Sequence, residues 1–246
     1  MSTSSANNQV KSKERVAKHG EVFTAKREVN AMLDLVKQET ERLDSRFLEP
    51  ACGTGNFLEE ILLRKLSVAE RAAIPSGRKK AVPEKFERNS IVALTSIYGV
   101  ELQDDNAKEC RERLYEVWHS AYLRICKKSA SDLVCKCARF ILEKNIICGN
   151  ALSMKKVDAM QNDTDEPIVF SEWAFIGEYK VKRTDYRLDK MLEGEYSAKN
   201  ATEKETKEKT YRQGELFQDG GENDEGDIVK EFPPLPHYAR IAEYGE

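Results

Sequence analysis

The stretch Phe47-Leu48-Glu49-Pro50-Ala51-Cys52-Gly53-Thr54-Gly55-Asn56-Phe57-Leu58 decides the fold. Its beginning, from Arg46 to Pro50, is a short apolar run typical of a buried strand, and residues 51–55 place two glycines in the turn that follows. From Asn56 to Leu66, apolar side chains recur on one side of a helix, at Phe57, Leu58, Ile61 and Leu62. The order of strand, tight loop and helix predicts the first unit of an α/β fold.

Helices are expected on both sides of this unit. Upstream, Glu28 to Leu43 has the periodicity of a helix with one buried face, made of Val29, Met32, Leu33 and Val36. Downstream, a helix is expected from Asp104, whose carboxylate can cap the free amides of the first turn. Its inward residues would be Ala107, Cys110, Leu114, Val117 and Ala121. A further helix is expected from Ser131 to Glu143.

Two more strands alternate with these helices. One is expected at Ser96 to Glu101, within the run from Ile91 to Leu102, and the other at Asn145 to Cys148, followed by the turn Gly149-Asn150-Ala151. Strands that alternate with helices predict a mainly parallel sheet with helices on both faces.

The composition is that of a soluble protein with one substantial core. The chain has 246 residues, 40% hydrophobic and 34% charged, with a net charge of −3. No apolar run approaches the roughly 18 to 20 residues needed to cross a bilayer, so no membrane contact is expected. The first residues, Met1 to Gln9, are small and polar and lack an export signal, which indicates a cytoplasmic protein. The six cysteines show no zinc-binding spacing, so reduced, mostly buried thiols and no metal site are expected.

Charged residues are distributed unevenly along the chain. Arg64 to Arg88 holds eight basic residues against three acidic ones, and this stretch is either a phosphate contact or a solvated loop between core elements. Residues 193–231 hold twelve acidic against six basic residues and few apolar ones, which predicts a flexible linker. We therefore expect a disordered N-terminus at 1–14, one domain at 15–192, the linker at 193–231 and a C-terminal segment at 232–246.

Three predicted loops meet beyond the carboxyl ends of the strands, where α/β sheets bind ligands. The first, at 49–56, has glycines that let the main chain approach a ligand closely. The second follows Glu101, whose carboxylate can accept hydrogen bonds from two ribose hydroxyls. The third contains Asn150, whose amide can donate to and accept from an adenine edge. Together the three loops predict a nucleoside pocket.

These segments also resemble a known family. Residues 47–58 resemble the cofactor loop of S-adenosylmethionine-dependent DNA methyltransferases of restriction-modification systems, especially the adenine-N6 class. Residues 19–24 are similar to that class's upstream cofactor motif, with Ala25 where the family has proline. Residues 98–101 and 147–152 resemble its ribose-binding and adenine-contacting segments, with Asn150 where aspartate is commoner. The similarity covers Arg15 to Leu152, and residues 167–173 resemble an insertion in some of these enzymes.

The resemblance implies a Rossmann-like class I methyltransferase fold and S-adenosylmethionine as cofactor. The implied cofactor-binding residues are Phe23, Thr24, Glu49, Pro50, Ala51, Gly53, Glu101 and Asn150. Phe23 and Thr24 would contact the methionine end, and Glu49, Ala51 and Gly53 would surround the methionine and sulfonium. Duplex DNA is the implied partner, with a second modification or specificity subunit as a further one.

The family's catalytic signature is not found. Its members grip the target adenine with a tetrad of Asn or Asp, two prolines and an aromatic residue, and no such tetrad follows Asn150. The one Pro-Pro pair, in Phe232-Pro233-Pro234-Leu235, has neither the acceptor nor the aromatic in place, and Pro236-His237-Tyr238 is expected to be a docking or turn segment. No catalytic residue is therefore assigned.

Two functions stay open from the sequence. The first is a DNA adenine methyltransferase that is partial or needs a partner chain, and the second is a catalytically silent cofactor-binding protein with a regulatory or anti-restriction role. The segments Glu172 to Phe175 and Tyr179 to Arg183 combine aromatic and basic residues, as nucleic-acid surfaces do. A hairpin at the sheet edge whose Trp173 and Phe175 fill the core is the favoured alternative.

Overall fold

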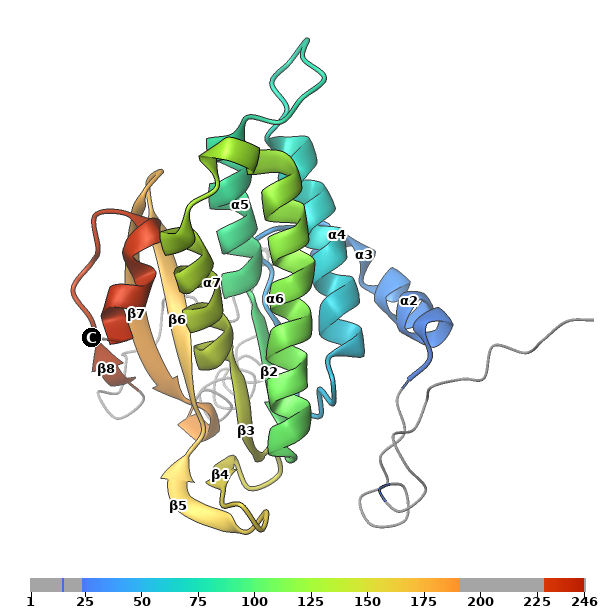
Figure 1. Ribbon diagram of the computed structural model, residues 1–246. Coiled ribbons are helices and arrows are strands. Elements are labelled where there is room, and N and C mark those ends of the chain that lie inside the picture. Colours follow the sequence, from blue (N-terminus) through green and yellow to red (C-terminus); the bar gives the residue numbers. More distant parts are fainter. Residues whose placement is uncertain (1–14, 16–23, 191–227, 246) are drawn as a thin grey trace, which may run out of the picture.

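The computed structural model describes residue 15, residues 24–190 and residues 228–245 (Figure 1). Five strands form the main sheet in the order β1-β2-β3-β4-β5. The first three are parallel, namely β1 (Phe47–Glu49), β2 (Ile97–Glu101) and β3 (Ile146–Asn150). Strands β4 (Lys155–Val157) and β5 (Asp163–Pro167) continue the sheet in antiparallel fashion. The expectation of an α/β fold with parallel central strands is confirmed.

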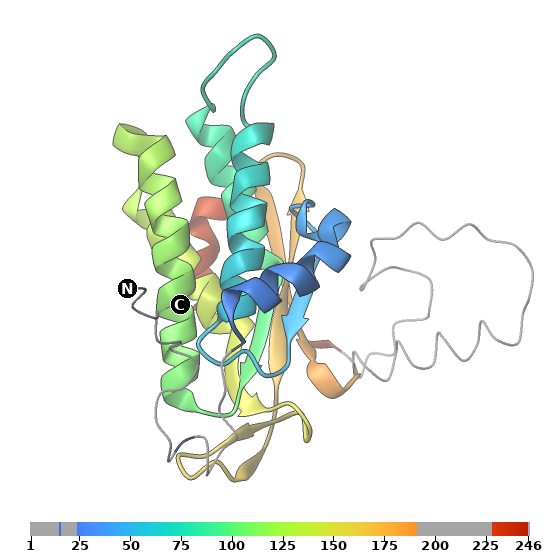
Figure 2. The same cartoon turned by 90° about the vertical axis from the view of Figure 1, so that its right-hand side faces the viewer.

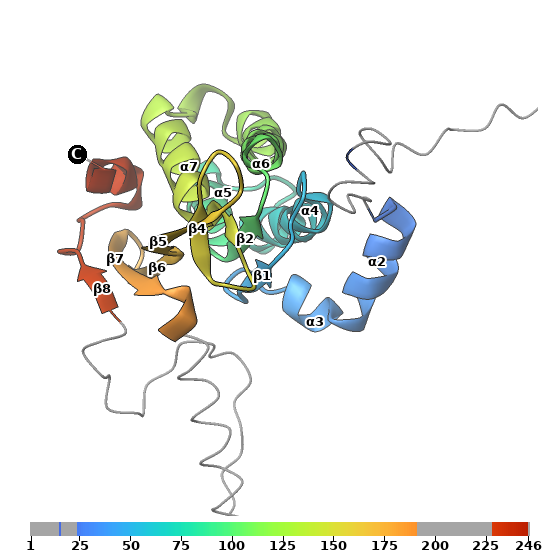
Figure 3. The ribbon, with the colours of Figure 1, turned by 90° about the horizontal axis from the view of Figure 1, so that it is seen from below.

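One face of this sheet is covered by helices, as the view from below shows (Figure 3). They are α4 (Asn56–Ala72), α5 (Pro83–Thr95), α6 (Asp104–Cys126) and α7 (Asp132–Asn145). Their apolar sides form one core with Ile97 of β2 and Ile146 of β3. Within the part of the chain that the structure describes, no helix is long and apolar enough to span a membrane.

Strands cover the opposite face, which corrects the prediction of helices on both faces. Successive residues of a strand point to opposite sides, so Tyr98 and Val100 of β2 face away from the helices. They pack with Ile168, Phe170 and Leu188 in a second, smaller core. Phe170 belongs to β6 (Val169–Ile176), which pairs with β7 (Lys180–Arg187) and, through it, with β8 (Ile228–Glu231). The sequence between β3 and β7 forms hairpins, so no crossover helix is available for this face.

Several predicted boundaries also need correction. The helix expected at Glu28 to Leu43 is two helices, α2 (Lys26–Leu35) and α3 (Lys37–Thr40), because Val36 leaves the helical conformation. Of the predicted buried face, Val29 and Leu33 are buried, whereas Met32 is 55% and Val36 44% exposed. Asp104 does not cap α6, because it is the first residue inside the helix and its carboxylate pairs with Lys108 instead.

Helix α5 was not expected, although Pro83 at its first position and the apolar spacing of Phe86, Ile91 and Leu94 are signals for it. The predicted linker at 193–231 ends too late, because Ile228–Glu231 form β8, and residues 193–227 lie outside the described residues. The short helix η2 (Tyr238–Gly245) then packs on α7. Its first residue, Tyr238, donates a hydrogen bond to Glu87 of α5 at 2.9 Å, so the end of the segment expected to dock or turn packs against the helical layer.

The amino end of β1 is fixed by a buried lysine. The Lys65 ammonium on α4 donates hydrogen bonds to the carbonyls of Arg42, Leu43 and Ser45 and to the Ser96 hydroxyl. Burial lowers the pKa of Lys65 to about 7, and the nearby carboxylates of Asp44 and Glu39 oppose this effect because they favour the charged form. One side chain therefore joins the segment before β1, the segment before β2 and helix α4.

We expect Lys65→Met to lower the free energy of unfolding by about 2 to 4 kcal/mol, because it leaves buried carbonyls without donors. Urea denaturation followed by circular dichroism measures the loss. The matched control is Lys37→Met on α3, an exposed position where the change should stay within about 0.5 kcal/mol. Equal effects of the two substitutions would contradict the structural role of Lys65.

Candidate functional site

Parallel pairing brings the carboxyl ends of β1, β2 and β3 to one edge of the sheet. Glu49 of β1 lies opposite Gly99 of β2, and Glu101 of β2 lies opposite Cys148 of β3. The loops that leave the three strands consequently begin side by side, at the lower end of the sheet in Figure 1. The predicted residues Glu49, Glu101 and Asn150 are thus placed at the same edge.

The glycine loop after β1 has a backbone that only glycine adopts easily. Gly53 has a φ of +53° and Gly55 a φ of +92°, both in the left-handed region. The amide of Cys52 donates to the carbonyl of Val100 at 3.0 Å, which ties the loop to β2. A Cβ atom added at Gly55 would lie 2.8 Å from the Cys110 sulfur, because α6 packs directly against the loop.

Glu101 lies at the carboxyl end of β2, the strand between β1 and β3. One of its carboxylate oxygens accepts a hydrogen bond from the Gly53 amide at 2.8 Å, and the other accepts from the Gln103 amide at 3.0 Å. The residue is 7% exposed, so this carboxylate is almost fully enclosed. Each oxygen keeps a second lone pair. The arrangement holds the carboxylate in one orientation and leaves capacity for two further donors.

Glu49 supplies a second carboxylate at the edge. It accepts a hydrogen bond from the Ala51 amide at 3.4 Å, and burial raises its pKa above the usual range. Pro50 and Ala51 are exposed, so the loop surface between the two carboxylates faces outward. A cation near Glu49 would be favoured there, because it would offset the cost of burying this charge.

Asn150 is held in a turn of its own. Its side-chain nitrogen donates to Asp163 at 3.0 Å, and its side-chain oxygen accepts from the Leu152 amide at 3.0 Å. Asp163 begins β5, so the β4–β5 hairpin folds back on the end of β3. Both polar ends of the Asn150 amide are thus engaged locally, and a ligand would compete with these bonds or use the remaining lone pair and proton.

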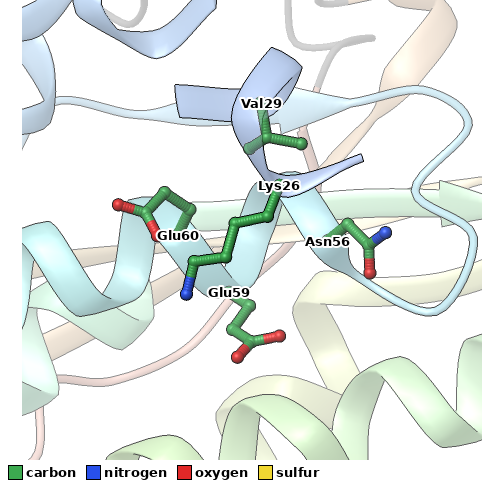
Figure 4. A pocket seen from close by; sticks show the side chains of 5 residues that line it. All are labelled: Lys26, Val29, Asn56, Glu59 and Glu60. Atoms are coloured by element: carbon green, nitrogen blue, oxygen red, sulfur yellow. The ribbon is translucent and has the colours of Figure 1, made fainter. Parts of the chain in front are cut away.

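The segment before α2 reaches the start of α4. Phe23 lies outside the described residues, but Thr24 is described, and its carbonyl accepts a hydrogen bond from the side-chain nitrogen of Asn56 at 3.1 Å. Beside this contact is a cavity of about 110 Å³ between α2 and α4, which is lined by the side chains shown in Figure 4. They are those of Lys26, Val29, Asn56, Glu59 and Glu60.

Comparison with known proteins agrees with this geometry. From residue 23 to residue 202 the chain matches the model of the family MmeI, DNA-methyltransferase domain. The chain belongs to this family. No curated protein and no solved structure matches it.

Membership in the MmeI methyltransferase family makes the chain a DNA methyltransferase domain of the restriction-modification kind. The matched range contains every residue implied for cofactor binding, from Phe23 to Asn150, together with all five strands of the main sheet. This bears out the predicted family at the level of DNA methylation. The methyl donor that such a domain implies is S-adenosylmethionine.

The structure of the MmeI-family domain also reveals residues that the sequence did not single out. Arg15 forms an ion pair with Asp105 at 2.7 Å and donates to Gln103, so it lies over the loop after β2. Arg113 of α6 donates to the Asn56 side chain at 2.6 Å. Nothing in the local pattern marks these arginines, because their partners are distant in the sequence.

Two further sequence features of this methyltransferase domain are structural. Trp173 is 5% exposed and donates to the buried Asn145 side chain at 3.1 Å, and Phe175 packs against the same core. The favoured interpretation of a hairpin that fills the core is confirmed. The Pro-Pro pair precedes Leu235, whose amide donates to Val181 at the turn end of the β6–β7 hairpin.

The opposite end of that hairpin is the one near the carboxyl edge of β1, β2 and β3. There the amide of Ile168, just before β6, donates to the carbonyl of Met154 in the turn after β3. Because Leu235 is bonded at the turn end, the Pro-Pro pair is separated from the carboxyl edge of β1, β2 and β3 by the length of the hairpin.

We expect Gly55→Ala to lower the free energy of unfolding by about 2 to 4 kcal/mol, because a left-handed backbone and a clash with Cys110 act together. Gly77→Ala is the matched control, since Gly77 has a φ of +74° but no atom within 4 Å of the added carbon, and should cost about 1 kcal/mol. Chemical denaturation compares them. Adding Cys110→Ala should recover part of the loss at Gly55, and equal losses at both glycines would contradict the steric explanation.

Proposed function

We propose that this domain binds S-adenosylmethionine at the carboxyl edge of β1, β2 and β3 and serves in adenine-N6 methylation of duplex DNA, with its catalytic loop supplied by another segment or chain. The observation that carries the proposal is the clamp on Glu101. Its two oxygens are fixed by the amides of Gly53 and Gln103, at 2.8 and 3.0 Å. A buried, oriented carboxylate with free lone pairs suits two adjacent ribose hydroxyls.

The surrounding residues fit the rest of the cofactor. The left-handed Gly53 lets the main chain approach the ligand, and Glu49 offers a carboxylate to the cationic sulfonium. Thr24 lies beside the start of α4, where the free amides and the positive end of the helix dipole favour the methionine carboxylate. Asn150 ends β3, the strand next to β2, and the remaining proton and lone pair of its amide would serve the adenine edge.

The chemistry also requires a means of gripping the target adenine. Methylation of adenine in a duplex needs the base to be turned out of the stack and gripped, and the sequence contains no tetrad for this step. Strand β1 ends the sheet, and no described strand pairs with its outer edge. A further strand that pairs there would bring its own carboxyl end, and the loop after it, beside Glu49.

The missing tetrad also favours the second candidate, a catalytically silent cofactor-binding protein with a regulatory or anti-restriction role. Such a protein would keep the Glu101 clamp and bind the cofactor without methyl transfer. Cofactor binding is therefore common to both candidates, and transfer to DNA distinguishes them.

For cofactor binding, we expect Glu101→Ala to weaken the affinity for S-adenosylmethionine by about 1.5 to 3 kcal/mol, the usual loss for a hydrogen bond to a charged group. Isothermal titration calorimetry of parent and variant gives the difference. The control is Glu116→Ala, which removes an exposed carboxylate from α6 and should leave the affinity unchanged. Equal affinity of the parent and Glu101→Ala would remove the assignment of Glu101 to the ribose.

For methyl transfer, the purified chain is incubated with labelled S-adenosylmethionine and unmethylated DNA of mixed sequence, alone and with proteins encoded beside its gene. We expect label in DNA, at N6 of adenine, only when a protein that completes the site is present. Label with the lone chain would show that no partner is needed. Cofactor binding without transfer under every condition would support the silent candidate.

A further inference from the structure

A loop projects beyond the rest of the fold at the end of the helical layer where α4 ends and α5 begins. It joins α4 to α5 and is closed at its base by a hydrogen bond from the Val82 amide to the Ala73 carbonyl at 2.9 Å. Figure 2 shows it extending past the ends of both helices. Gly77 at its tip has a φ of +74° and open space around it. The loop thus has a fixed base and an unobstructed tip.

The tip carries three consecutive basic residues, Arg78, Lys79 and Lys80, all exposed. A second basic pair, Lys127 and Lys128, lies in η1 (Lys127–Ser129) directly after α6, and both residues are exposed. The Cys126 thiol before this pair contacts the Pro83 carbonyl at the loop's end, 3.6 Å away. Two basic segments more than forty residues apart in sequence thus lie at the same end of the helical layer, and we call them together the basic tip (residues 70–85 and 124–132).

Charge at the basic tip differs from that of the rest of the chain. It contains eight basic and three acidic residues, a surplus of five positive charges, whereas the whole chain has a net charge of −3. One of the three acids, Glu70, is already paired with Arg124 at 2.7 Å. Within the described residues, Arg78, Lys79 and Lys80 form no ion pair. Their charge is available to an external anion.

The structure separates these residues from other basic residues of the stretch between Arg64 and Arg88. Arg64 pairs with Glu60 and Asp34, Lys65 is buried, and Arg88 donates to main-chain carbonyls of the β6–β7 turn. The basic residues at the two ends of this stretch therefore have partners within the fold. The phosphate-contact interpretation fits only the residues in its middle, Arg78 to Lys80.

Helix dipoles account for only part of the basic tip. Lys127 and Lys128 follow the carbonyl end of α6, where positive charge is favoured. The loop residues Arg78 to Lys80 are not in a helix and have no such role. Residues 76–80 also lack any large apolar side chain, which a protein partner would need for an interface core. This surface therefore fits a polyanion, which carries regularly spaced negative charges and binds without an apolar interface core.

We propose that the basic tip is a contact surface for the phosphate backbone of duplex DNA, separate from the edge that holds the cofactor. Helix α4 has 17 residues and so spans about 25 Å between the glycine loop and the basic tip. This inference rests on the proposed function, in which the methylated base lies at the carboxyl edge of the sheet, remote from DNA at the basic tip. Contacts of this kind add affinity without reading sequence, and their strength depends on salt.

The test measures binding of a fluorescent duplex of about 40 base pairs and mixed sequence by anisotropy, from about 50 to 200 mM salt. The variant Arg78→Gln, Lys79→Gln, Lys80→Gln should bind at least about tenfold more weakly at the lower salt. Its slope of log affinity against log salt should fall by about 1 for each phosphate that the variant no longer neutralises. A further variant, Lys127→Gln with Lys128→Gln, should lower the slope again.

The control replaces three exposed lysines elsewhere, Lys37→Gln, Lys136→Gln and Lys230→Gln, which changes the net charge equally. Its slope should stay close to that of the parent. A parental slope in the basic-tip variant, or the same loss of affinity in the control, would overturn the proposal. S-adenosylmethionine affinity is measured on the same samples, and because the DNA assay contains no cofactor, failure of the cofactor site and failure of the basic tip are distinguishable.

Discussion

The hydrogen bond from the Gly53 amide to the Glu101 carboxylate is the contact on which the site depends. It joins the loop after β1 to the end of β2, and the amide of Gln103 fixes the same carboxylate from the other side. The loop can reach Glu101 only because Gly53 and Gly55 adopt left-handed backbone and because Cys52 is bonded to Val100. A buried carboxylate without these amides would be costly, so the loop and the strand stabilise each other.

The sequence predicts this part of the fold well, and the reason is local. Strand β1, the glycine loop and α4 have adjacent signals, and Glu101 directly ends an apolar run. Predictions fail where contacts between segments distant in the sequence determine the secondary structure. The missed helix α5 begins in a charged, proline-containing stretch that is typical of a loop, and the break at Val36 follows no glycine or proline. Likewise, β6 covers the second face of the sheet because the β6–β7 hairpin folds back onto β2. The periodicity of the sequence does not show this packing.

The same distinction applies to the site residues. Glu49, Gly53 and Glu101 are brought together by the parallel register, which alternation of strands and helices already implies. The engagement of Asn150 by Asp163 depends on the β4–β5 hairpin, and that of Thr24 by Asn56 on how α2 meets α4. Lys65 is the clearest case, because a lysine in a basic stretch is typical of a surface, and only the fold places three main-chain carbonyls around it.

Both ends of β1 are thus fixed by polar groups inside the fold, Lys65 at the amino end and the Glu101 clamp at the carboxyl end. Neither contact needs a residue from beyond this domain. The carboxyl edge of β1, β2 and β3 is consequently held in place by groups of this domain alone, and its geometry does not depend on a target base. In a domain of the MmeI family whose sequence lacks the tetrad that grips adenine, this ordered edge fits the proposal that cofactor binding and base recognition are supplied separately. The outer edge of β1, with which no described strand pairs, is where a separately supplied loop would meet the proposed cofactor site.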